Sequence, residues 1–196
     1  MSNLVLKKSI DEIVFASLDV ETTGLSPLNS RVCEIAAVTF QNDERKENFS
    51  SLINPEMDIP AVASNVHGIT DDMIAGSPKF GEVIPKLAAI MEGTVLLGHN
   101  VKFDIKFLQM EFERVGMKFP ELEFVDTLEI ARKFGNFTNN RLGTVAKELG
   151  IAAEGWHRAL SDVIMTQKIF EHFSLVFKKD GVVTLNDMMR KIKAGK

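Results

Sequence analysis

The order of strand-like and helix-like segments limits the folds open to this chain more than any other feature of its sequence. Three runs rich in apolar, β-branched or aromatic residues come first, as is typical of buried strands: residues 13–20, 31–40 and 49–53. The polar stretch 41–48 joins the second run to the third, which favours an antiparallel pair.

The rest of the chain alternates between helical patterns and short strands. Helices are predicted over residues 80–91, 102–115, 142–149 and 158–177, with another short helix that begins at Asp126. Two brief strands are predicted at residues 94–97 and 123–125. Strands that come first and then alternate with helices indicate an α/β fold, in which a mixed sheet is flanked by helices.

The length of the chain predicts one domain, because 196 residues can bury one substantial core but rarely two. We expect this domain to cover residues 1–177. Residues 178–196 are rich in lysine and are expected to form a frayed C-terminal tail.

Composition excludes several classes of protein. With 45% hydrophobic and 26% charged residues, the chain is neither disordered nor collagen-like. It has no apolar run near the roughly 20 residues that cross a bilayer, and its N-terminus lacks a signal peptide, so we expect a cytoplasmic protein without membrane contact. Cys33 is the only cysteine, which excludes an intrachain disulfide and a thiolate zinc cluster; a buried, unreactive thiol is expected.

Two acids end the first predicted strand. Asp19 and Glu21 are two positions apart, so their side chains point to the same side of the sheet. Two carboxylates that face one space repel each other, and at the end of an apolar strand this is costly unless a cation lies between them. The pair alone is weak evidence, since acids in loops often produce the same pattern.

Two more acids occupy similar places in the sequence. Asp104 and Asp162 each lie in the first turns of a predicted helix, where either acid alone is more simply explained by the free N–H groups of the helix. Together, however, the four acids stand at the ends of separate apolar elements. They therefore predict an oxygen-ligand site suited to magnesium or manganese, and bound dications would offset the net charge of −4.

A histidine accompanies the last acid. His157 precedes Asp162 by five residues, so both can face one site only if His157 lies in the loop before the helix. A base with an ordinary pKa of about 6.5 suits proton transfer near neutral pH. An exposed surface histidine is the alternative. Asp126 is a fifth acid, but its position before Glu129 predicts a helix cap, and we leave it out of the site.

Three segments of the chain closely resemble the three motifs of the DEDDh exonucleases, a DnaQ-like family. These segments are residues 19–24 (DVETTG), 99–104 (HNVKFD) and 157–162 (HRALSD). The resemblance runs from about residue 13 to residue 173 and includes the segment 66–70 (VHGIT). The family includes the proofreading subunit of bacterial DNA polymerase III and the exonuclease region of the Gram-positive replicative polymerase.

This resemblance implies a ribonuclease H-like, five-stranded mixed sheet and a hydrolase that releases nucleoside 5′-monophosphates from DNA 3′ ends, in proofreading or repair. It implies two Mg²⁺ ions, for which Mn²⁺ can substitute. Asp19 would bridge both ions, Glu21 and Asp162 would complete the first site, and Asp104 would hold the second. His157 would take the proton from the attacking water.

The same resemblance implies residues around the terminal nucleotide, namely Thr22, Thr23, Leu25, His67 and Phe103. Leu25 and Phe103 can pack on a base face, although core packing is favoured for Phe103 because it also fits the buried helix stripe. His67 can equally be a turn residue.

Other residues are expected to play simpler parts. His99 is expected to order the site without taking part in it, and His172 to be solvated. Four basic residues near the site, together with the lysine-rich tail, are candidates for phosphate contacts: Lys102, Lys106, Arg141 and Arg158. So few basic residues predict a short footprint on the strand.

Two alternatives remain open at this point. The first is a 3′-to-5′ exoribonuclease that trims RNA or oligoribonucleotides, because acceptance of a 2′-hydroxyl depends on contacts that the sequence does not define. The second is a non-catalytic module that binds strand ends, which would be expected to lack one of the five catalytic residues. We expect the partner to be a single-stranded or frayed DNA 3′ end, with a DNA polymerase subunit as a further candidate.

Overall fold

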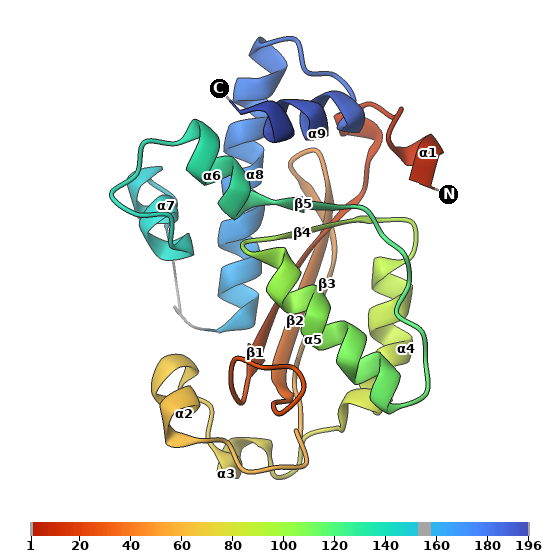
Figure 1. The fold of residues 1–196 in the computed structure, drawn as a ribbon, viewed down its shortest axis with the longest axis vertical. Coiled ribbons are helices and arrows are strands. Elements are labelled where there is room, and N and C mark those ends of the chain that lie inside the picture. Colours follow the sequence, from red (N-terminus) through yellow and green to blue (C-terminus); the bar gives the residue numbers. More distant parts are fainter. Residues whose placement is uncertain (1, 153–157, 196) are drawn as a thin grey trace.

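A five-stranded mixed sheet forms the centre of the protein (Figure 1). The structure is a computed structural model, and it describes residues 2–152 and 158–195. The strand order is β3-β2-β1-β4-β5. The strands are β1 (Phe15–Thr22), β2 (Val32–Gln41), β3 (Glu44–Leu52), β4 (Val95–Gly98) and β5 (Phe124–Asp126). β1 runs antiparallel to β2 and parallel to β4, so the predicted mixed sheet is confirmed.

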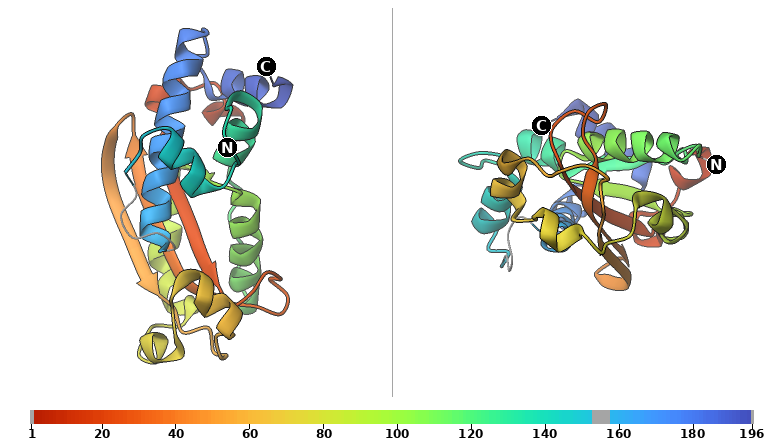
Figure 2. Two further views of the ribbon diagram at one scale, coloured as in Figure 1. Left: turned by 90° about the vertical axis from the view of Figure 1, so that its left-hand side faces the viewer. Right: turned by 90° about the horizontal axis from the view of Figure 1, so that it is seen from below.

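Helices cover both faces of this sheet (Figures 1 and 2). In chain order they are α1 (Ser2–Val5), the 3-10 helix η1 (Ile10–Glu12), α2 (Ala61–His67), α3 (Asp71–Ile74), α4 (Phe80–Met91), α5 (Val101–Arg114), α6 (Thr127–Phe134), α7 (Leu142–Glu148), α8 (Ala159–Lys179) and α9 (Leu185–Ala194). The long helix α8 packs on one face together with α6, α7 and α9, whereas α4 and α5 pack on the other. Each predicted helix lies within two residues of its expected bounds.

The side chains of β1 alternate strictly between the two faces. Phe15 belongs to the core cluster under α8, whereas Ala16, Leu18 and Val20 belong to the cluster under α4 and α5. Ser17 points to the α8 side, where its hydroxyl donates to the carbonyl of Val163 at 2.9 Å. Since strand side chains have a period of two, the odd-numbered positions that follow also face α8.

The third strand is longer than its sequence pattern predicts. β3 begins at Glu44, not at residue 49, and the polar stretch forms most of it. β3 is an edge strand, and its first five side chains are exposed to solvent. Because these side chains are exposed, they need not alternate between apolar and polar residues. Charged side chains on an edge strand also discourage pairing with other molecules.

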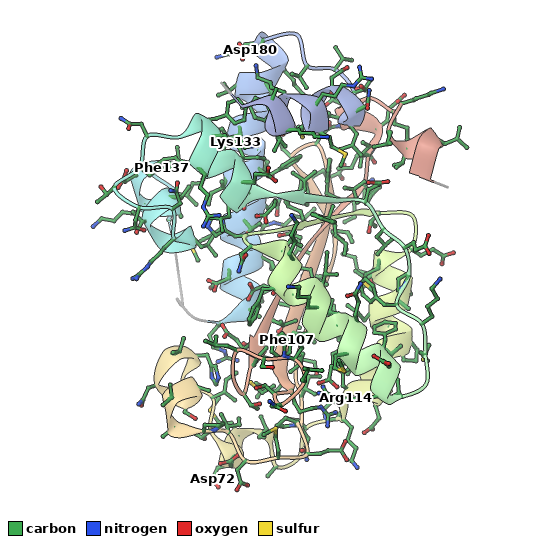
Figure 3. All side chains as sticks on the ribbon, viewed as in Figure 1. Asp72, Phe107, Arg114, Lys133, Phe137 and Asp180 are labelled. Carbon is green, nitrogen blue, oxygen red and sulfur yellow. The ribbon has the colours of Figure 1, made fainter. Side chains whose placement is uncertain are left out.

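The prediction of a frayed C-terminal tail is wrong for residues 185–194. These residues form α9, whose Leu185, Met188 and Ile192 are buried in the cluster under α8. Thr184 caps the helix, and Lys133 of α6 donates to the carbonyl of Ile192 at 2.6 Å (Figure 3). The division of the chain at residue 177 stays a prediction, but in the structure α9 shares the core of α8.

One smaller expectation is confirmed within the described part of the chain. Cys33 is fully buried, and burial raises the pKa of its thiol to about 12, so the thiol is unreactive. Among the helices in the described ranges, none combines the length and the apolar character required to span a lipid bilayer.

Candidate active site

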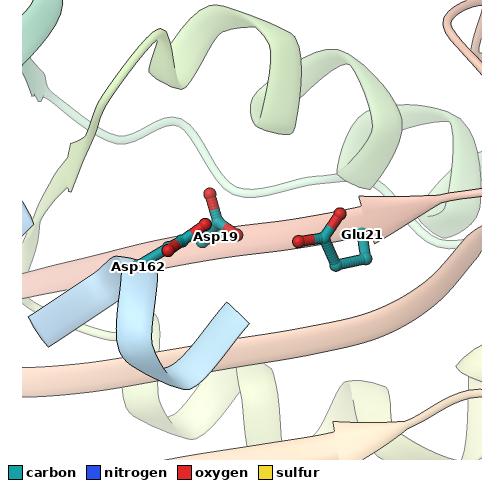
Figure 4. A group of neighbouring side chains, drawn as sticks. All are labelled: Asp19, Glu21 and Asp162. Carbon is teal, nitrogen blue, oxygen red and sulfur yellow. The ribbon is translucent and has the colours of Figure 1, made fainter. Parts of the chain in front are cut away.

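Three carboxylates meet where β1 ends beside the start of α8 (Figure 4). Asp19 and Glu21 lie on the α8 side of β1, as the alternation of the strand requires, and Asp162 lies in the first turn of α8. Each of the three offers one oxygen, and these oxygens all lie within 4.8 Å of one another. The structure thus brings together acids that are more than 140 positions apart in the sequence.

The fourth predicted acid approaches β1 from its edge. Asp104, in the first turn of α5, is only 4% exposed, and its Oδ1 accepts a hydrogen bond from the backbone N–H of Val20 at 3.1 Å. β4 pairs with β1 only as far as Ser17, so the N–H of Val20 has no partner in β4. Asp104 satisfies this group and so fixes its own carboxylate between the positions of Asp19 and Glu21.

Burial and mutual repulsion raise the pKa values of these acids. Desolvation is the largest cause for Asp19, whose pKa lies well above its ordinary value, and the charges of Asp104 and Asp162 add to it. Desolvation, Asp162 and Glu34 raise the pKa of Glu21 to about 7.

The pKa of Asp104 is raised in the same way. Burial raises its pKa to about 8, although the hydrogen bond from Val20 lowers it. Crowded carboxylates resist ionisation unless a cation compensates their charge, and hard oxygen donors are the ligands that Mg²⁺ and Mn²⁺ favour. The donor set therefore fits a divalent metal ion, and the cluster can bind one.

An ion pair between a buried acid and a partly exposed arginine lies next to the cluster and was not predicted from the sequence. Glu34 lies opposite Glu21 in β2 and is only 2% exposed. Its carboxylate accepts two bonds from Nε of Arg158, at 3.1 and 3.2 Å, and one from Nη2 at 2.7 Å. It also accepts the backbone N–H of Ala159 at 3.1 Å. Glu34 therefore ties β2 to the first turn of α8, which carries Asp162.

Arg158 consequently has a structural contact where a phosphate contact was expected. The sequence carried one signal for this pair, because Glu34 is the single acid within the apolar run 32–40. An acid at such a position is buried with a partner, but the sequence does not say which.

The predicted base lies outside the described residues. His157 belongs to the segment 153–157, of which the structure gives no description. Its role stays a prediction.

The turn after β1 holds three of the residues expected around a terminal nucleotide. The Thr22 hydroxyl donates to the carbonyl of Gly24 at 2.7 Å, and the buried Thr23 hydroxyl accepts the N–H of Arg31 at 3.0 Å. Leu25, by contrast, is 87% exposed. The threonines therefore stabilise the turn, and Leu25 is left open to a ligand.

A second buried acid, also not predicted, fixes this turn to α5. Glu111 is 1% exposed and accepts bonds from Arg31 Nε at 2.8 Å and Arg114 Nη1 at 2.9 Å. Arg114 in turn donates to the carbonyl of Pro27 at 2.6 Å (Figure 3). The loop that carries Leu25 is thereby anchored to the helix that carries Asp104.

The other two residues expected to contact a ligand, His67 and Phe103, make contacts within the fold. His67 is buried, and its Nδ1 accepts the N–H of Ile69 at 3.1 Å, which is the turn role considered for it. Phe103 is half-buried, with its ring 4.9 Å from that of Phe107, so the core packing favoured for it is confirmed.

The residues expected to have ordering or solvated roles behave accordingly. His99 Nε2 donates to the carbonyl of Asn140 at 2.8 Å, and its Nδ1 lies 2.9 Å from Oγ1 of Thr127. Asp126 is the N-cap of α6 and accepts the N–H of Leu128. Glu129, expected to complete that cap, instead pairs with Lys133 at 3.0 Å. His172 is exposed.

Comparisons with known proteins agree with this architecture. The exonuclease family model RNase T matches residues 17–170. The DNA polymerase III PolC-type protein of Thermotoga petrophila is 31% identical over 186 residues, which are 95% of this chain but 14% of that protein. The 3′-5′ exonuclease DinG of Bacillus subtilis is 35% identical over 158 residues, which are 80% of this chain and 17% of that protein. The chain thus spans about a sixth or less of the length of these relatives.

One solved structure illustrates the similarity in fold. Exonuclease I of E. coli, in complex with a dT13 oligonucleotide, superposes with a TM-score of 0.74 at 20% identity and covers 82% of this chain and 41% of its own. This likeness confirms the ribonuclease H-like fold expected from the sequence. The match to the family model extends over most of the chain, from β1 to α8, and includes all four clustered acids. The chain therefore belongs to the RNase T exonuclease family.

Proposed function

We propose that this chain is a metal-dependent 3′-to-5′ exonuclease that releases nucleoside 5′-monophosphates from DNA 3′ ends. The observation that carries the proposal is the convergence of Asp19, Glu21 and Asp162 within 4.8 Å, with Asp104 beside them. The similarity to DinG, a 3′-5′ exonuclease, supports the 3′-to-5′ direction, and the oligonucleotide bound to exonuclease I supports DNA as the substrate.

The four acids would hold two Mg²⁺ ions, with Mn²⁺ as a substitute. Asp19 would bridge both ions, Glu21 and Asp162 would complete one site, and Asp104 the other. When bound, such ions stabilise charge on the attacking and leaving oxygens of an in-line displacement at phosphorus.

The chain's own side chains would supply proton transfer and orientation. His157 would take the proton from the attacking water, since a neutral imidazole is a competent base near pH 7. Glu34 and Arg158 would keep the start of α8 in place. Leu25 would contact the terminal base, because its side chain is exposed at the turn that follows β1.

The substrate would be a single-stranded or frayed 3′ end, in proofreading or repair. The PolC-type relatives support a link to a DNA polymerase, because in them the matched region is a small part of a polymerase chain. A polymerase partner would also hold the strand over a longer stretch than this chain can reach alone.

A ladder assay tests the proposed activity. Single-stranded DNA, duplex DNA and RNA of matched sequence, each labelled at the 5′ end, would be incubated with the protein and Mg²⁺ or with chelator. We expect a stepwise ladder from the 3′ end of DNA with Mg²⁺ only. Asp19→Asn should abolish the ladder, whereas Asp43→Asn, which neutralises an exposed acid, should leave it intact.

Three outcomes would contradict the proposal. Internal cuts would indicate an endonuclease, activity in chelator would exclude a metal-dependent reaction, and faster shortening of RNA than of DNA would replace the proposed substrate.

A further inference from the structure

A second polar site lies between α6 and α7, two helices whose places in the fold can be followed in Figure 1. It is an open hollow of about 320 Å³ lined by His99, Leu128, Arg132, Asn140 and Arg141. Leu128 and Arg132 are four positions apart in α6 and so share one face of that helix. Arg141 lies immediately before α7.

The hollow is strongly cationic for a protein of net charge −4. Among the described residues that line it, two are arginines and none is an acid. Within residues 2–152 and 158–195, neither Arg132 nor Arg141 forms an ion pair, whereas the neighbouring Lys133 is paired with Glu129. Two unpaired guanidinium groups at one hollow favour an anionic ligand.

The loop that presents Arg141 is held in place on both sides. His99 Nε2 donates to the carbonyl of Asn140 at 2.8 Å, and the N–H of Arg141 donates to Oδ1 of Asn139 at 3.0 Å. Burial lowers the pKa of His99, so this imidazole is neutral near pH 7 and acts as a fixed support. Arg141 therefore starts from a fixed backbone, which reduces the entropy lost when its side chain binds.

The hollow and the acidic cluster lie at the same edge of the sheet. β1, β4 and β5 run parallel, so their C-terminal ends share this edge, where β1 carries Asp19 and Glu21. His99 follows β4, the neighbour of β1, whereas Asp126 ends β5, caps α6 and accepts the N–H of Asn100 at 2.9 Å. A strand whose end reaches the acidic cluster can thus extend toward α6.

We propose that the hollow between α6 and α7 binds a backbone phosphate of the strand whose 3′ end occupies the acidic cluster. Arg132 and Arg141 supply the charge, and the Asn140 side chain is a further donor. A phosphate is favoured over a base, because among the described residues that line the hollow only Leu128 is apolar, and the one ring, that of His99, is held by Asn140 and Thr127. The contact does not read sequence and rests on the proposed function.

The salt dependence of binding tests this site. Affinity for a fluorescein-labelled oligothymidylate with a hydrolysis-resistant 3′-terminal linkage would be measured by anisotropy in Mg²⁺, so that the cluster is occupied and the strand is not cut, over a range of KCl concentrations. Each neutralised phosphate of a single strand contributes a slope of about −0.7 to log K against log salt. Arg132→Gln with Arg141→Gln should therefore flatten the slope by about 0.7 and weaken binding roughly fivefold at 0.1 M salt, because one phosphate is no longer neutralised.

Two matched variants separate this site from the overall charge. Arg132→Lys with Arg141→Lys keeps both charges and should restore the slope. Lys46→Gln with Lys118→Gln removes two charges from exposed residues elsewhere and should leave slope and affinity unchanged. A wild-type slope in the glutamine variant, or an equal loss in the Lys46 and Lys118 variant, would overturn the proposed site.

The proposed exonuclease activity and the proposed phosphate site can be refuted separately. If wild-type protein with Mg²⁺ does not shorten an unmodified strand, the proposed exonuclease is wrong, whatever the slopes. If it does shorten the strand and the slopes do not differ, only the phosphate site is wrong.

Discussion

At the scale of single residues, the proposed metal site depends on carboxylates whose joint ionisation is unfavourable. Glu21 and Asp104 have pKa values raised to about 7 and about 8, mainly by burial. Between about pH 4.5 and pH 8 the unfolded chain has lost protons that the metal-free folded protein still holds. The free energy of unfolding of the metal-free protein should therefore fall as pH rises through this range.

The substitution Asp19→Asn tests this repulsion. In chelator at pH 8 the free energy of unfolding of the variant should exceed that of the wild type by on the order of 1 kcal/mol or more, because one of the crowded charges is gone. The variant should therefore unfold at a higher temperature. Mg²⁺ should stabilise the wild type and not the variant. Thermal unfolding followed by circular dichroism at pH 5 and pH 8 measures both effects, and equal responses of the two proteins to Mg²⁺ would contradict the account.

The ion pair between Glu34 and Arg158 supports a second prediction. Glu34→Gln leaves Arg158 without its charged partner and should reduce the free energy of unfolding by about 1–3 kcal/mol. It should also lower kcat for strand shortening, because the first turn of α8 carries Asp162. Denaturant unfolding and single-turnover kinetics measure the two quantities.

The chain offers a matched control for that substitution. Glu121 forms an ion pair with Lys118 in which both side chains are more than 80% exposed. Glu121→Gln should therefore change stability by less than about 0.5 kcal/mol. If Glu34→Gln were equally mild and fully active, Glu34 would have no positioning role.

At the scale of elements, the sequence predicts the strands and helices whose apolar patterns are regular. The period of two in β1 correctly places Asp19 and Glu21 on one face, and the apolar pattern of α8 correctly places Asp162 in its first turn. The convergence itself could not be derived from these patterns, because it depends on which face of the sheet α8 covers.

Two elements escape this reasoning for physical reasons. β3 is an edge strand with exposed side chains, so its first half shows no apolar pattern. The sequence of α9 has few apolar residues among its lysines, so the segment was expected to fray. Its Leu185, Met188 and Ile192 are nevertheless buried. Arg158 lies 124 positions from Glu34, and Arg31 lies 80 positions from Glu111, so no local pattern can reveal these two pairs.

The packing of α9 yields a prediction at this scale. Met188 is fully buried, so Met188→Ala should cost about 2–5 kcal/mol of unfolding free energy through lost contacts and a cavity. Met117, which is 48% exposed, supplies the control, and Met117→Ala should be nearly neutral. Equal, small effects in denaturant unfolding would mean that α9 does not contribute to the core.

At the scale of the whole molecule, the proposed function would use both the acidic cluster and the cationic hollow between α6 and α7. The acidic cluster would repel a polyanion until cations occupy it, and the hollow would attract one. This arrangement would allow a chain of net charge −4 to act on nucleic acid. It also fits a unit that occurs in its relatives as a small part of much longer chains.

Anomalous diffraction from crystals soaked in Mn²⁺ tests the central claim most directly. The account predicts anomalous peaks within bonding distance of oxygens from Asp19, Glu21 and Asp162, with Asp104 beside them, and no such peaks in Asp19→Asn crystals. Crystals of the wild type that hold Mn²⁺ elsewhere but show no peak among these carboxylates would contradict it.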